Sequence, residues 1–335
     1  MTLLRLTDRG LYCEAGDFYV DPWAPVERAV VTHAHGDHAT WGCRRYLASA
    51  AGRGVLALRL GPDAAIETLD WGDSVSLGSV RVSLHPAGHI LGSAQVRVEL
   101  GGDVWVVSGD YKTDPDPTCA AFEPVRCGTF ITESTFGLPI YRWPAEADVF
   151  ADINAWWRAN AAEGRTSLLF GYALGKAQRL LAGLDPSIGP ILTHGAVERM
   201  TTPYREAGIP LPPTIHAATV TRKADREGAL VLAPPSAEGS PWTRRFAPFS
   251  AAFASGWMRV RGARRRRALD RGFTLSDHVD WPALLAAIDA TGASRIWVTH
   301  GFTGPVTRWL TERGLEARAL ATRFEGERDD DVEPE

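Results

Sequence analysis

Three histidines and one aspartate lie within six residues of this chain, in the sequence HAHGDH that begins at residue 33. The apolar run at 29–31 precedes this block and is typical of a buried strand. Neutral imidazole and carboxylate groups are ligands that zinc and similar divalent ions take. His33 and His35 can point at one ion from an extended turn. Because Asp37 and His38 can point at a second, the spacing favours a metal centre over a histidine-rich surface loop.

Three more ligand-type residues occur later, each near the end of a strand-like run and next to a glycine. They are His89, Asp110 and His300, which follow the runs 80–84, 104–107 and 295–299, respectively. A neighbouring glycine allows the backbone to turn sharply or to approach another group closely. One histidine of this kind is usually a core residue, but four strand ends with the same pattern predict a site for two divalent ions.

These motifs resemble those of the β-CASP nucleases, the nucleic-acid-processing branch of the metallo-β-lactamase-fold hydrolases. The block at 33–38 matches the signature of that superfamily, and the three later ligands follow in the same order. Asp21 matches an aspartate that supports the metal ligands from behind. Glu133 in TESTFG and His278 in SDHVD resemble the acidic and histidine motifs of the β-CASP branch. The resemblance covers most of the chain.

Within this branch, the chain is most similar to the bacterial DNA-ligase-associated exonucleases. This narrower resemblance rests on a short cap segment and on two motifs, FGYALGKAQ at 170–178 and ASGWMR at 254–259. RNA-processing relatives usually carry a larger cap and additional RNA-binding domains, and we see neither here. The resemblance implies a DNA exonuclease that works 5′-to-3′ on DNA ends or single strands. It also implies a role in DNA repair, with an ATP-dependent DNA ligase and other repair proteins as partners.

The resemblance further implies two metal ions per chain, zinc first, with manganese or iron as alternatives. The expected ligands are His33, His35 and His89 for one ion and Asp37, His38 and His300 for the other, with Asp110 bridging. Two such ions can activate a hydroxide and clamp a phosphate. Asp37, Glu133 and His278 are the expected catalytic residues, with His278 donating a proton to the leaving oxygen. A purely structural Glu133–His278 pair is the alternative.

Candidate substrate contacts are less specific. They are Lys112, Lys176, Ser255, Gly256, Trp257, Arg264, Arg265, Arg266 and Arg267. The basic side chains can meet phosphates, and the segment 255–257 offers a hydroxyl, a bare backbone and a ring on which a base can stack. Each could instead be structural, and Trp257 in particular could belong to the core.

The charge distribution is uneven although the formal net charge is only −4. Residues 241–271 contain nine arginines and one acidic residue, whereas 325–335 contain seven acidic residues and one arginine. A basic stretch is typical of a protein that binds a phosphate backbone, although a solvated loop is the alternative. We expect the acidic tail to be disordered.

Composition excludes several classes of protein. An apolar content of 45% and a charged content of 23% over 335 residues are ordinary for a globular chain. The four cysteines show no paired metal spacing and are expected to be reduced thiols. The first twenty residues lack an apolar signal core, and no apolar run reaches the length of a membrane span. We therefore expect a cytoplasmic protein without a membrane partner.

The predicted fold class is α/β, a metallo-β-lactamase αββα sandwich with an inserted α/β β-CASP cap domain. The expected parts are 1–140 and 266–324 for the metallo-β-lactamase domain, 141–265 for the cap, and 325–335 for the tail. We expect the first half to be rich in strands, with an early helix that opens near Asp37. The cap should alternate strands and helices, which implies a parallel sheet. Its predicted elements are an amphipathic helix ending at Gly164, strands at 166–170, 191–193, 229–233 and 249–254, and a helix at 176–182. A helix over 281–290 should follow the cap.

Three other functions are the alternatives. An RNA-processing β-CASP ribonuclease would use the same ligands, and sequence discriminates against it only weakly. A silent nucleic-acid-binding scaffold would be expected to have lost metal ligands, whereas this chain has all seven. A small-molecule hydrolase is disfavoured by the arginine-rich segment and by the pair of Glu133 and His278.

Overall fold

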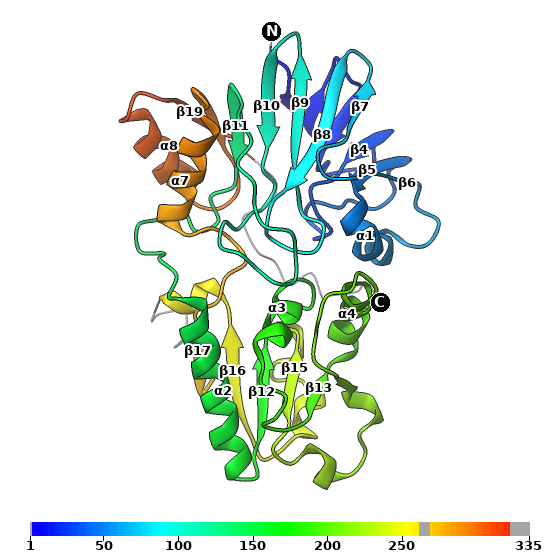
Figure 1. The fold of residues 1–335 in the computed structure, drawn as a ribbon, viewed down its shortest axis with the longest axis vertical. Helices are drawn as coiled ribbons and strands as arrows, with labels where there is room; N and C mark the ends of the chain where they lie inside the picture. Colours follow the sequence, from blue (N-terminus) through cyan, green and yellow to red (C-terminus); the bar gives the residue numbers. More distant parts are fainter. Residues whose placement is uncertain (1, 261–268, 322–335) are drawn as a thin grey trace. The chain divides into compact units, whose positions relative to one another are not determined.

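A computed structural model describes residues 2–260 and 269–321 of the chain (Figure 1). These residues form two compact units. The first unit contains residues 2–142 and 278–321, and the second contains residues 143–260 and 269–277. The second unit is therefore an insertion in the sequence of the first. Among the helices described, none combines the length and the apolar character needed to cross a membrane.

The first unit is built on two β-sheets. One sheet follows the chain order, and its strands are β1 (Arg5–Thr7), β2 (Gly10–Cys13), β3 (Phe18–Val20), β4 (Arg28–Val30), β5 (Arg45–Ser49) and β6 (Ile66–Leu69). The other sheet has the order β19 (Glu316–Ala319), β18 (Arg295–Val298), β11 (Thr129–Thr132), β10 (Asp103–Val107), β9 (Ala94–Leu100), β8 (Val80–Pro86) and β7 (Ser74–Leu77). Strands β3 to β6 pair in parallel, as do β10, β11, β18 and β19. Several parallel strand ends therefore meet at one edge of each sheet.

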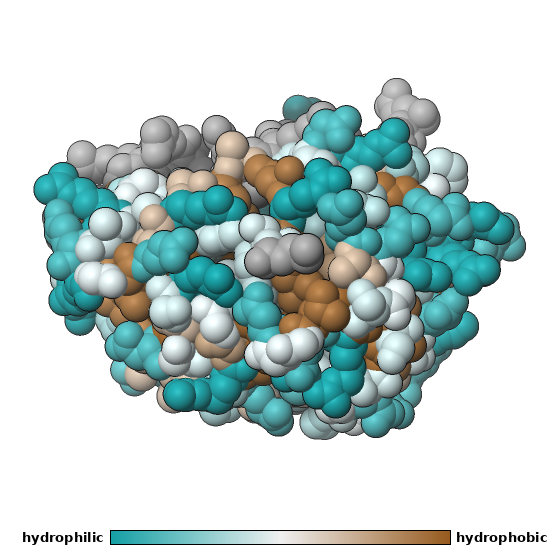
Figure 2. Space-filling view, turned by 90° about the horizontal axis from the view of Figure 1, so that it is seen from above, coloured by the Kyte–Doolittle hydropathy of each residue, from teal (hydrophilic) through white to brown (hydrophobic). Residues whose placement is uncertain are grey.

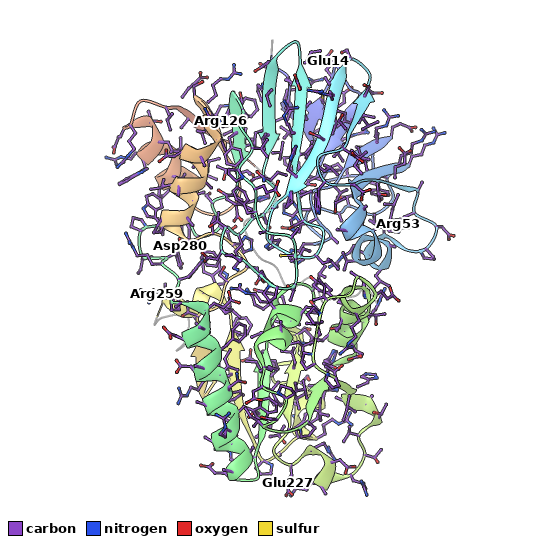
Figure 3. The ribbon with its side chains drawn as sticks, viewed as in Figure 1. Glu14, Arg53, Arg126, Glu227, Arg259 and Asp280 are labelled. Carbon is purple, nitrogen blue, oxygen red and sulfur yellow. The ribbon has the colours of Figure 1, made fainter. Side chains whose placement is uncertain are left out.

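The two sheets face each other across one hydrophobic core, and helices cover the outer face of the second sheet. Strand β10 shows how the sequence achieves this, because successive side chains of a strand point to opposite faces. Trp105 and Val107 lie in the core between the sheets. Val106 packs instead with α7 (Trp281–Thr291) and α8 (Thr303–Thr311). Asp280, labelled in Figure 3, accepts a hydrogen bond of 3.0 Å from Ala283 N and so caps the start of α7.

The second unit is a parallel sheet with three longer helices on one face and short helical segments on the other. Its strand order is β14 (Ile215–His216), β13 (Ile191–Thr193), β15 (Leu230–Ala233), β12 (Thr166–Phe170), β16 (Phe249–Ala254) and β17 (Arg271–Phe273). Its helices are α2 (Glu146–Ala162), α3 (Lys176–Gly183), α4 (Gly195–Glu206) and the short α5 (Pro241–Arg244). Leu169 packs with α2, α3 and α4, whereas Leu168 and Phe170 point to the other core. Because both faces are covered, the strands are nearly continuous apolar runs.

The mixed α/β class is confirmed, and so is the strand–helix alternation with a parallel sheet in the second unit. Strands β12, β13 and β16 begin and end at the predicted residues. Helices α2, α3 and α7 lie where helices were predicted, with ends that differ by a few residues. Long apolar runs bounded by glycine or proline made these elements predictable.

The predicted early helix near Asp37 is wrong. His38 N and Ala39 N both bond to His35 O, which makes a single turn, and the first helix is α1 (Arg53–Leu60). After the turn, the Thr40 hydroxyl donates a hydrogen bond to the carbonyl of Pro22. An irregular loop lets several polar side chains converge on one point, which a helix would spread around its axis.

Most large apolar side chains of the described residues are buried. Trp41, Ile140 and Ile215 are the large apolar residues described as exposed. Figure 2 shows the apolar residues of one face as small groups between hydrophilic ones. Scattered exposure of this kind is ordinary for a folded chain.

Candidate metal centre

Six predicted ligands of the first unit gather at the ends of strands. His33, His35 and His38 lie in the loop after β4, and the other three follow β8, β10 and β18: His89, Asp110 and His300. They form two groups, in each of which one ligand atom per residue lies within 4.8 Å of the others. The first group is His33, His35, His89 and Asp110, and the second is His38, Asp110 and His300. Asp110 belongs to both, which is the position expected of a bridging ligand.

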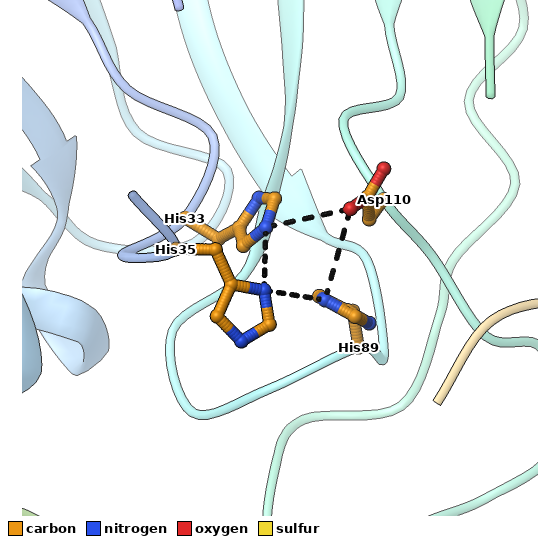
Figure 4. Close-up of side chains that lie close together, drawn as sticks. All are labelled: His33, His35, His89 and Asp110. Atoms are coloured by element: carbon orange, nitrogen blue, oxygen red, sulfur yellow. Dashed lines mark hydrogen bonds and ion pairs between the residues drawn. The ribbon is translucent and has the colours of Figure 1, made fainter. Parts of the chain in front are cut away.

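The first group has the spacing of a four-ligand site (Figure 4). His35 Nδ1 lies 3.1 Å from His33 Nε2 and 3.1 Å from His89 Nε2. Asp110 Oδ2 lies 3.6 Å from His33 Nε2 and 3.9 Å from His89 Nε2. Donors of a tetrahedral zinc site are about 3.3 Å apart, given metal–nitrogen distances of roughly 2.0–2.1 Å. The four side chains therefore fit a divalent ion.

His38 provides the clearest test of whether a cation fits the second group. Its Nδ1 lies 2.7 Å from Asp21 Oδ2, so the Nδ1 proton is donated to that carboxylate. Its Nε2 is buried and has no hydrogen-bond partner among the described residues. This atom lies 3.4 Å from Asp110 Oδ2 and 3.7 Å from Asp37 Oδ2. A nitrogen lone pair that faces two carboxylates is repelled unless a positive charge lies between them, so the residues fit a metal ion.

Asp37 lies beside the second group. Its carboxylate approaches His38 Nε2, but it is not in either group whose ligand atoms all lie within 4.8 Å of one another. The coordination of Asp37 to the second ion therefore stays a prediction.

The electrostatics of the centre favour the ligand forms that bind metal. Burial lowers the pKa of His33 well below its usual value, and the charge of His38 lowers it further. Burial also lowers the pKa of His300. Burial alone would raise the pKa of Asp110, but His38 and other imidazoles outweigh it and hold this pKa well below its usual value. Neutral imidazoles and an ionised carboxylate are the forms that divalent ions require.

His38 differs from the other imidazoles. Burial acts to lower its pKa, but the carboxylates of Asp37, Asp110 and Asp21 together raise the pKa well above its usual value. These three carboxylates stabilise positive charge at this position, whether it is a proton or a metal ion.

Asp21 supports this arrangement from behind the ligands, where the sequence placed it. It accepts hydrogen bonds from Thr32 N (2.8 Å) and from the Thr32 hydroxyl (2.6 Å) as well as from His38. Its backbone has a positive φ of 43°, a conformation that side chains other than glycine rarely adopt. Thr32 is a site residue that sequence reasoning missed, although its position directly before the HAHGDH block was a signal.

Glu133 and His278 form a buried pair next to the first group. His278 Nδ1 lies 2.9 Å from each carboxylate oxygen of Glu133. Glu133 Oε1 also accepts a hydrogen bond of 2.8 Å from Tyr111 N. The His278 ring lies 4.7 Å from the ring of His89, between centroids. Glu133 therefore fixes Nδ1 of His278, and with it the orientation of the ring.

Tight backbone packing fixes the last ligand. His300 has a φ of 53° and Gly301 a φ of 69°. A Cβ atom on Gly301 would come within 2.4 Å of the Ser134 carbonyl oxygen. The Ser134 hydroxyl donates to the carbonyl of His300. Ser134, which follows Glu133, was also missed as a supporting residue.

The predicted substrate contacts lie in different surroundings. Lys112 is buried in the first unit, and its ammonium group donates to the carbonyls of Asp114 (2.9 Å) and Pro115 (3.4 Å). Lys176 is buried in the second unit, where it pairs with Asp277 at 2.8 Å. Both lysines therefore have partners within their own units, and phosphate binding by either stays a prediction.

The remaining predicted contacts lie in the second unit or outside the described residues. Ser255 is buried and accepts a hydrogen bond of 3.3 Å from Trp257 N. Gly256 is buried, and Trp257 is partly buried against an apolar core of the second unit. Arg264, Arg265, Arg266 and Arg267 fall outside the residues that the structure describes.

The fold and the site together define a mixed α/β protein with a candidate centre for divalent metal ions. No family model matches the chain. Over 316 residues it is 35% identical to a probable DNA ligase of Opitutus terrae, in a match that covers 93% of this chain and 30% of that relative. It is also similar to Ysh1 endoribonucleases, with 33% identity over 122 residues in Candida albicans and 31% over 124 residues in Saccharomyces cerevisiae.

These matches cover only part of the relatives. The two Ysh1 matches each span 36% of this chain, and 14% and 15% of those relatives. The chain thus spans less than a third of each of these curated relatives. Among solved structures, a protein of unknown function from Enterococcus faecalis has a TM-score of 0.59 and 13% identity, over 89% of this chain and 80% of that one, so the two share a fold. The relatives confirm the resemblance of the chain to the β-CASP nucleases, the family of the Ysh1 endoribonucleases.

Proposed function

We propose that this chain is a metal-dependent DNA exonuclease of the β-CASP type that hydrolyses phosphodiester bonds from 5′ to 3′. One observation carries the proposal: six ligand-type residues converge at Asp110, and the buried Nε2 of His38 faces carboxylates with no hydrogen-bond partner among the described residues. In this proposal the first unit is the metallo-β-lactamase domain and the second unit is the β-CASP cap.

In the proposed centre, His33, His35 and His89 would hold one divalent ion, and Asp37, His38 and His300 would hold the other. Asp110 would be a ligand of both, and zinc is the first candidate. The chemistry that such ions supply when bound is Lewis acidity, which makes water a nucleophile at neutral pH and offsets charge on a phosphate. Asp21 and Thr32 hold His38 in the orientation that leaves Nε2 facing the centre.

The Glu133–His278 pair serves the leaving group in this proposal. Glu133 accepts the Nδ1 proton of His278, which fixes the tautomer and the plane of the ring. With a proton on each ring nitrogen, His278 donates the Nε2 proton to the departing 3′ oxygen and becomes neutral, while Glu133 stabilises the charged ring before the transfer. The position of His278 beside His89 supports this role.

DNA is proposed as the substrate because the relative whose match covers 93% of this chain is named a probable DNA ligase. We propose on the same ground that the enzyme acts in DNA repair together with a ligase. Lys112, the segment 255–257 and Arg264 to Arg267 remain the proposed DNA contacts, whereas Lys176 is buried and paired with Asp277. RNA is the second candidate substrate, because the relatives with the narrower match are named endoribonucleases.

The test is digestion of end-labelled substrates by purified protein with zinc, manganese or a chelator. Each oligonucleotide carries the label at its 5′ or its 3′ end and is offered as DNA or RNA, single- or double-stranded. The proposal expects immediate release of labelled nucleotide from 5′-labelled DNA, gradual shortening of 3′-labelled DNA, and no cleavage with chelator. Faster cleavage of RNA would support the ribonuclease instead, and binding without cleavage under all metals would support a scaffold.

A further inference from the structure

Trp41 is the most exposed large apolar residue that the structure describes. It is 73% exposed, whereas the other tryptophans of the chain are buried or half-buried. A single exposed apolar side chain is ordinary in itself. The place of Trp41 in the chain gives it significance, because it lies three residues after the candidate ligand His38.

The turn that carries Trp41 is held at both ends. The Tyr46 hydroxyl donates to the carbonyl of Thr40 at 2.9 Å and accepts a hydrogen bond of 2.8 Å from Cys43 N. One buried side chain therefore bridges the residues on either side of the tip. Gly42 completes the tip with a φ of 88°, in the left-handed region that favours glycine. The exposed ring thus stands on a backbone that is fixed from below.

This turn and the ligand His38 share one support. The Thr40 hydroxyl donates to the carbonyl of Pro22. Asp21, the residue before Pro22, lies 2.7 Å from His38 Nδ1. Because a chain extends by at most about 3.3–3.6 Å per residue, the Cα of Trp41 lies within roughly 11 Å of the Cα of His38. The turn that bears the exposed ring is therefore close to the candidate metal centre and belongs to the same unit.

An exposed tryptophan on a fixed backbone suits one kind of ligand in a nuclease. The indole ring offers a broad apolar face on a side chain with few rotatable bonds. Nucleobases stack on such faces, and the contact accepts any base because every base has a π-face. A ring on a fixed backbone also loses less freedom when it binds.

We propose that Trp41 is a stacking platform for one base of a single-stranded substrate. This inference rests on the proposed function. Stacked bases of one strand are about 3.4 Å apart, so the base lies about three nucleotides from the bond that is cleaved. Because this base is distant from the reacting atoms, the contact stabilises the bound substrate and the transition state alike. It therefore acts on KM and leaves kcat unchanged.

The first experiment compares Trp41→Ala with Trp41→Tyr and with Ile140→Ala. Ile140 is 56% exposed in the same unit and has no ring. One substrate is a single-stranded oligonucleotide. The other is a nitrophenyl phosphodiester, which is too short to reach the ring and whose leaving group needs no proton.

We expect Trp41→Ala to raise KM for the oligonucleotide by about 5- to 150-fold, the usual range for loss of one stacked base. Its kcat, bound metal and rate on the nitrophenyl substrate should stay unchanged. Trp41→Tyr should restore most of the affinity because it restores an aromatic face, and Ile140→Ala should match the original protein. An unchanged KM in Trp41→Ala would overturn the proposal.

Abasic oligonucleotides test whether the contact is stacking. One nucleotide without a base is moved along the strand, and affinity is measured at each position for the original protein and for Trp41→Ala. Stacking predicts one position at which the missing base weakens the original protein and costs nothing further in Trp41→Ala. Additive losses at every position would contradict stacking. The slope of log affinity against log salt should be the same in both proteins, since stacking releases no counterion, and a flatter slope in Trp41→Ala would also contradict it.

Tyr46→Phe tests the support of the turn. This variant keeps the buried ring but removes the hydroxyl that joins Thr40 and Cys43. We expect a smaller rise in KM than in Trp41→Ala, and no further rise when Trp41 is already alanine. A rise that persists without the Trp41 ring would show that the turn does not act through it.

Failure of this inference can be separated from failure of the proposed function. The latter would show as absent metal-dependent cleavage by the original protein, whereas the former leaves that cleavage intact and insensitive to Trp41→Ala. Tryptophan is also enriched at protein–protein interfaces, so the sedimentation of both proteins is measured. A changed oligomeric state with an unchanged KM would assign the ring to a contact between copies of the chain and overturn the proposal.

Discussion

Both units bury charged side chains, but they satisfy them in opposite ways. In the second unit, Lys176 and Arg179 of α3 meet the carboxylates of Asp277 and Glu146 at hydrogen-bond distance. In the first unit, imidazole nitrogens and the Asp110 carboxylate face one another, and His38 Nε2 has no hydrogen-bond partner among the described residues. The first pattern is complete as it stands and serves architecture. In our proposal, the second is completed by an added cation and serves chemistry.

The largest effect is expected from disrupting the cluster of ligand-type residues in the first unit. Asp110→Ala removes the ligand common to both groups, so we expect hydrolysis to fall to the level of chelator-treated protein while the sheets remain folded. Elemental analysis should show loss of bound metal, and circular dichroism should show retained structure. The control is Asp289→Ala, which removes an exposed carboxylate of the same unit. Unimpaired activity of Asp110→Ala would refute the metal centre.

The next effect separates the proton donor from the metal ligands. His278→Ala should keep its metal but lose about 10²–10⁴-fold in rate on DNA, the usual range for a general acid. A nitrophenyl phosphodiester should lose much less. His85→Ala is the matched control, because His85 lies in the same unit outside the cluster and bonds to Ser83. Loss of metal from His278→Ala would assign this residue to the centre itself.

Disrupting the ion-paired cluster of the second unit should lower the stability of the protein. Asp277→Ala leaves Lys176 and Arg179 buried without their shared carboxylate, which should cost about 3–5 kcal/mol in the free energy of unfolding. Urea denaturation measures this cost. Asp225→Ala breaks an exposed pair with Arg222 in the same unit and should change stability little. Similar results for the two variants would mean that the buried network does not form.

The smallest effect concerns the arginine run that lies outside the described residues. Changing Arg264, Arg265, Arg266 and Arg267 to serine should weaken DNA binding at low salt and leave turnover at saturating DNA nearly unchanged. For every arginine that binds a phosphate, its removal should flatten the slope of log affinity against log salt by about 0.7 for single strands or 0.9 for duplex. Binding titrations at several salt concentrations measure the slope. An unchanged slope would show that this run does not bind DNA.

The same contrast explains what could be predicted from the sequence. The candidate metal ligands were predictable from local motifs. A block such as HAHGDH, and a histidine or aspartate at the end of an apolar strand, are typical of metal sites. Strands β12, β13 and β16 were predictable because the residues of a two-sided parallel sheet are apolar without interruption. The helix predicted near Asp37 does not form, because the loop after β4 brings several polar side chains to one centre.

Partners far apart in the chain left no such signal. Asp277 lies 98 residues from Arg179, and nothing in the spacing links them. Lys176 was therefore a candidate for phosphate binding by sequence, whereas the structure turns it inward. Thr32 and Ser134 were missed for a related reason, because each acts by hydrogen bonding to a neighbour of the ligands and not by a ligand's own chemistry.

One oxygen atom, Asp110 Oδ2, lies between the two ligand groups and within reach of His33, His38 and His89. Two binding positions that share an atom cannot be loaded independently. Thermodynamic linkage requires that whatever factor the first ion imposes on the affinity for the second, the second imposes on the first. In the proposed two-ion centre, metal uptake is consequently a property of the pair, and a single dissociation constant would not describe it.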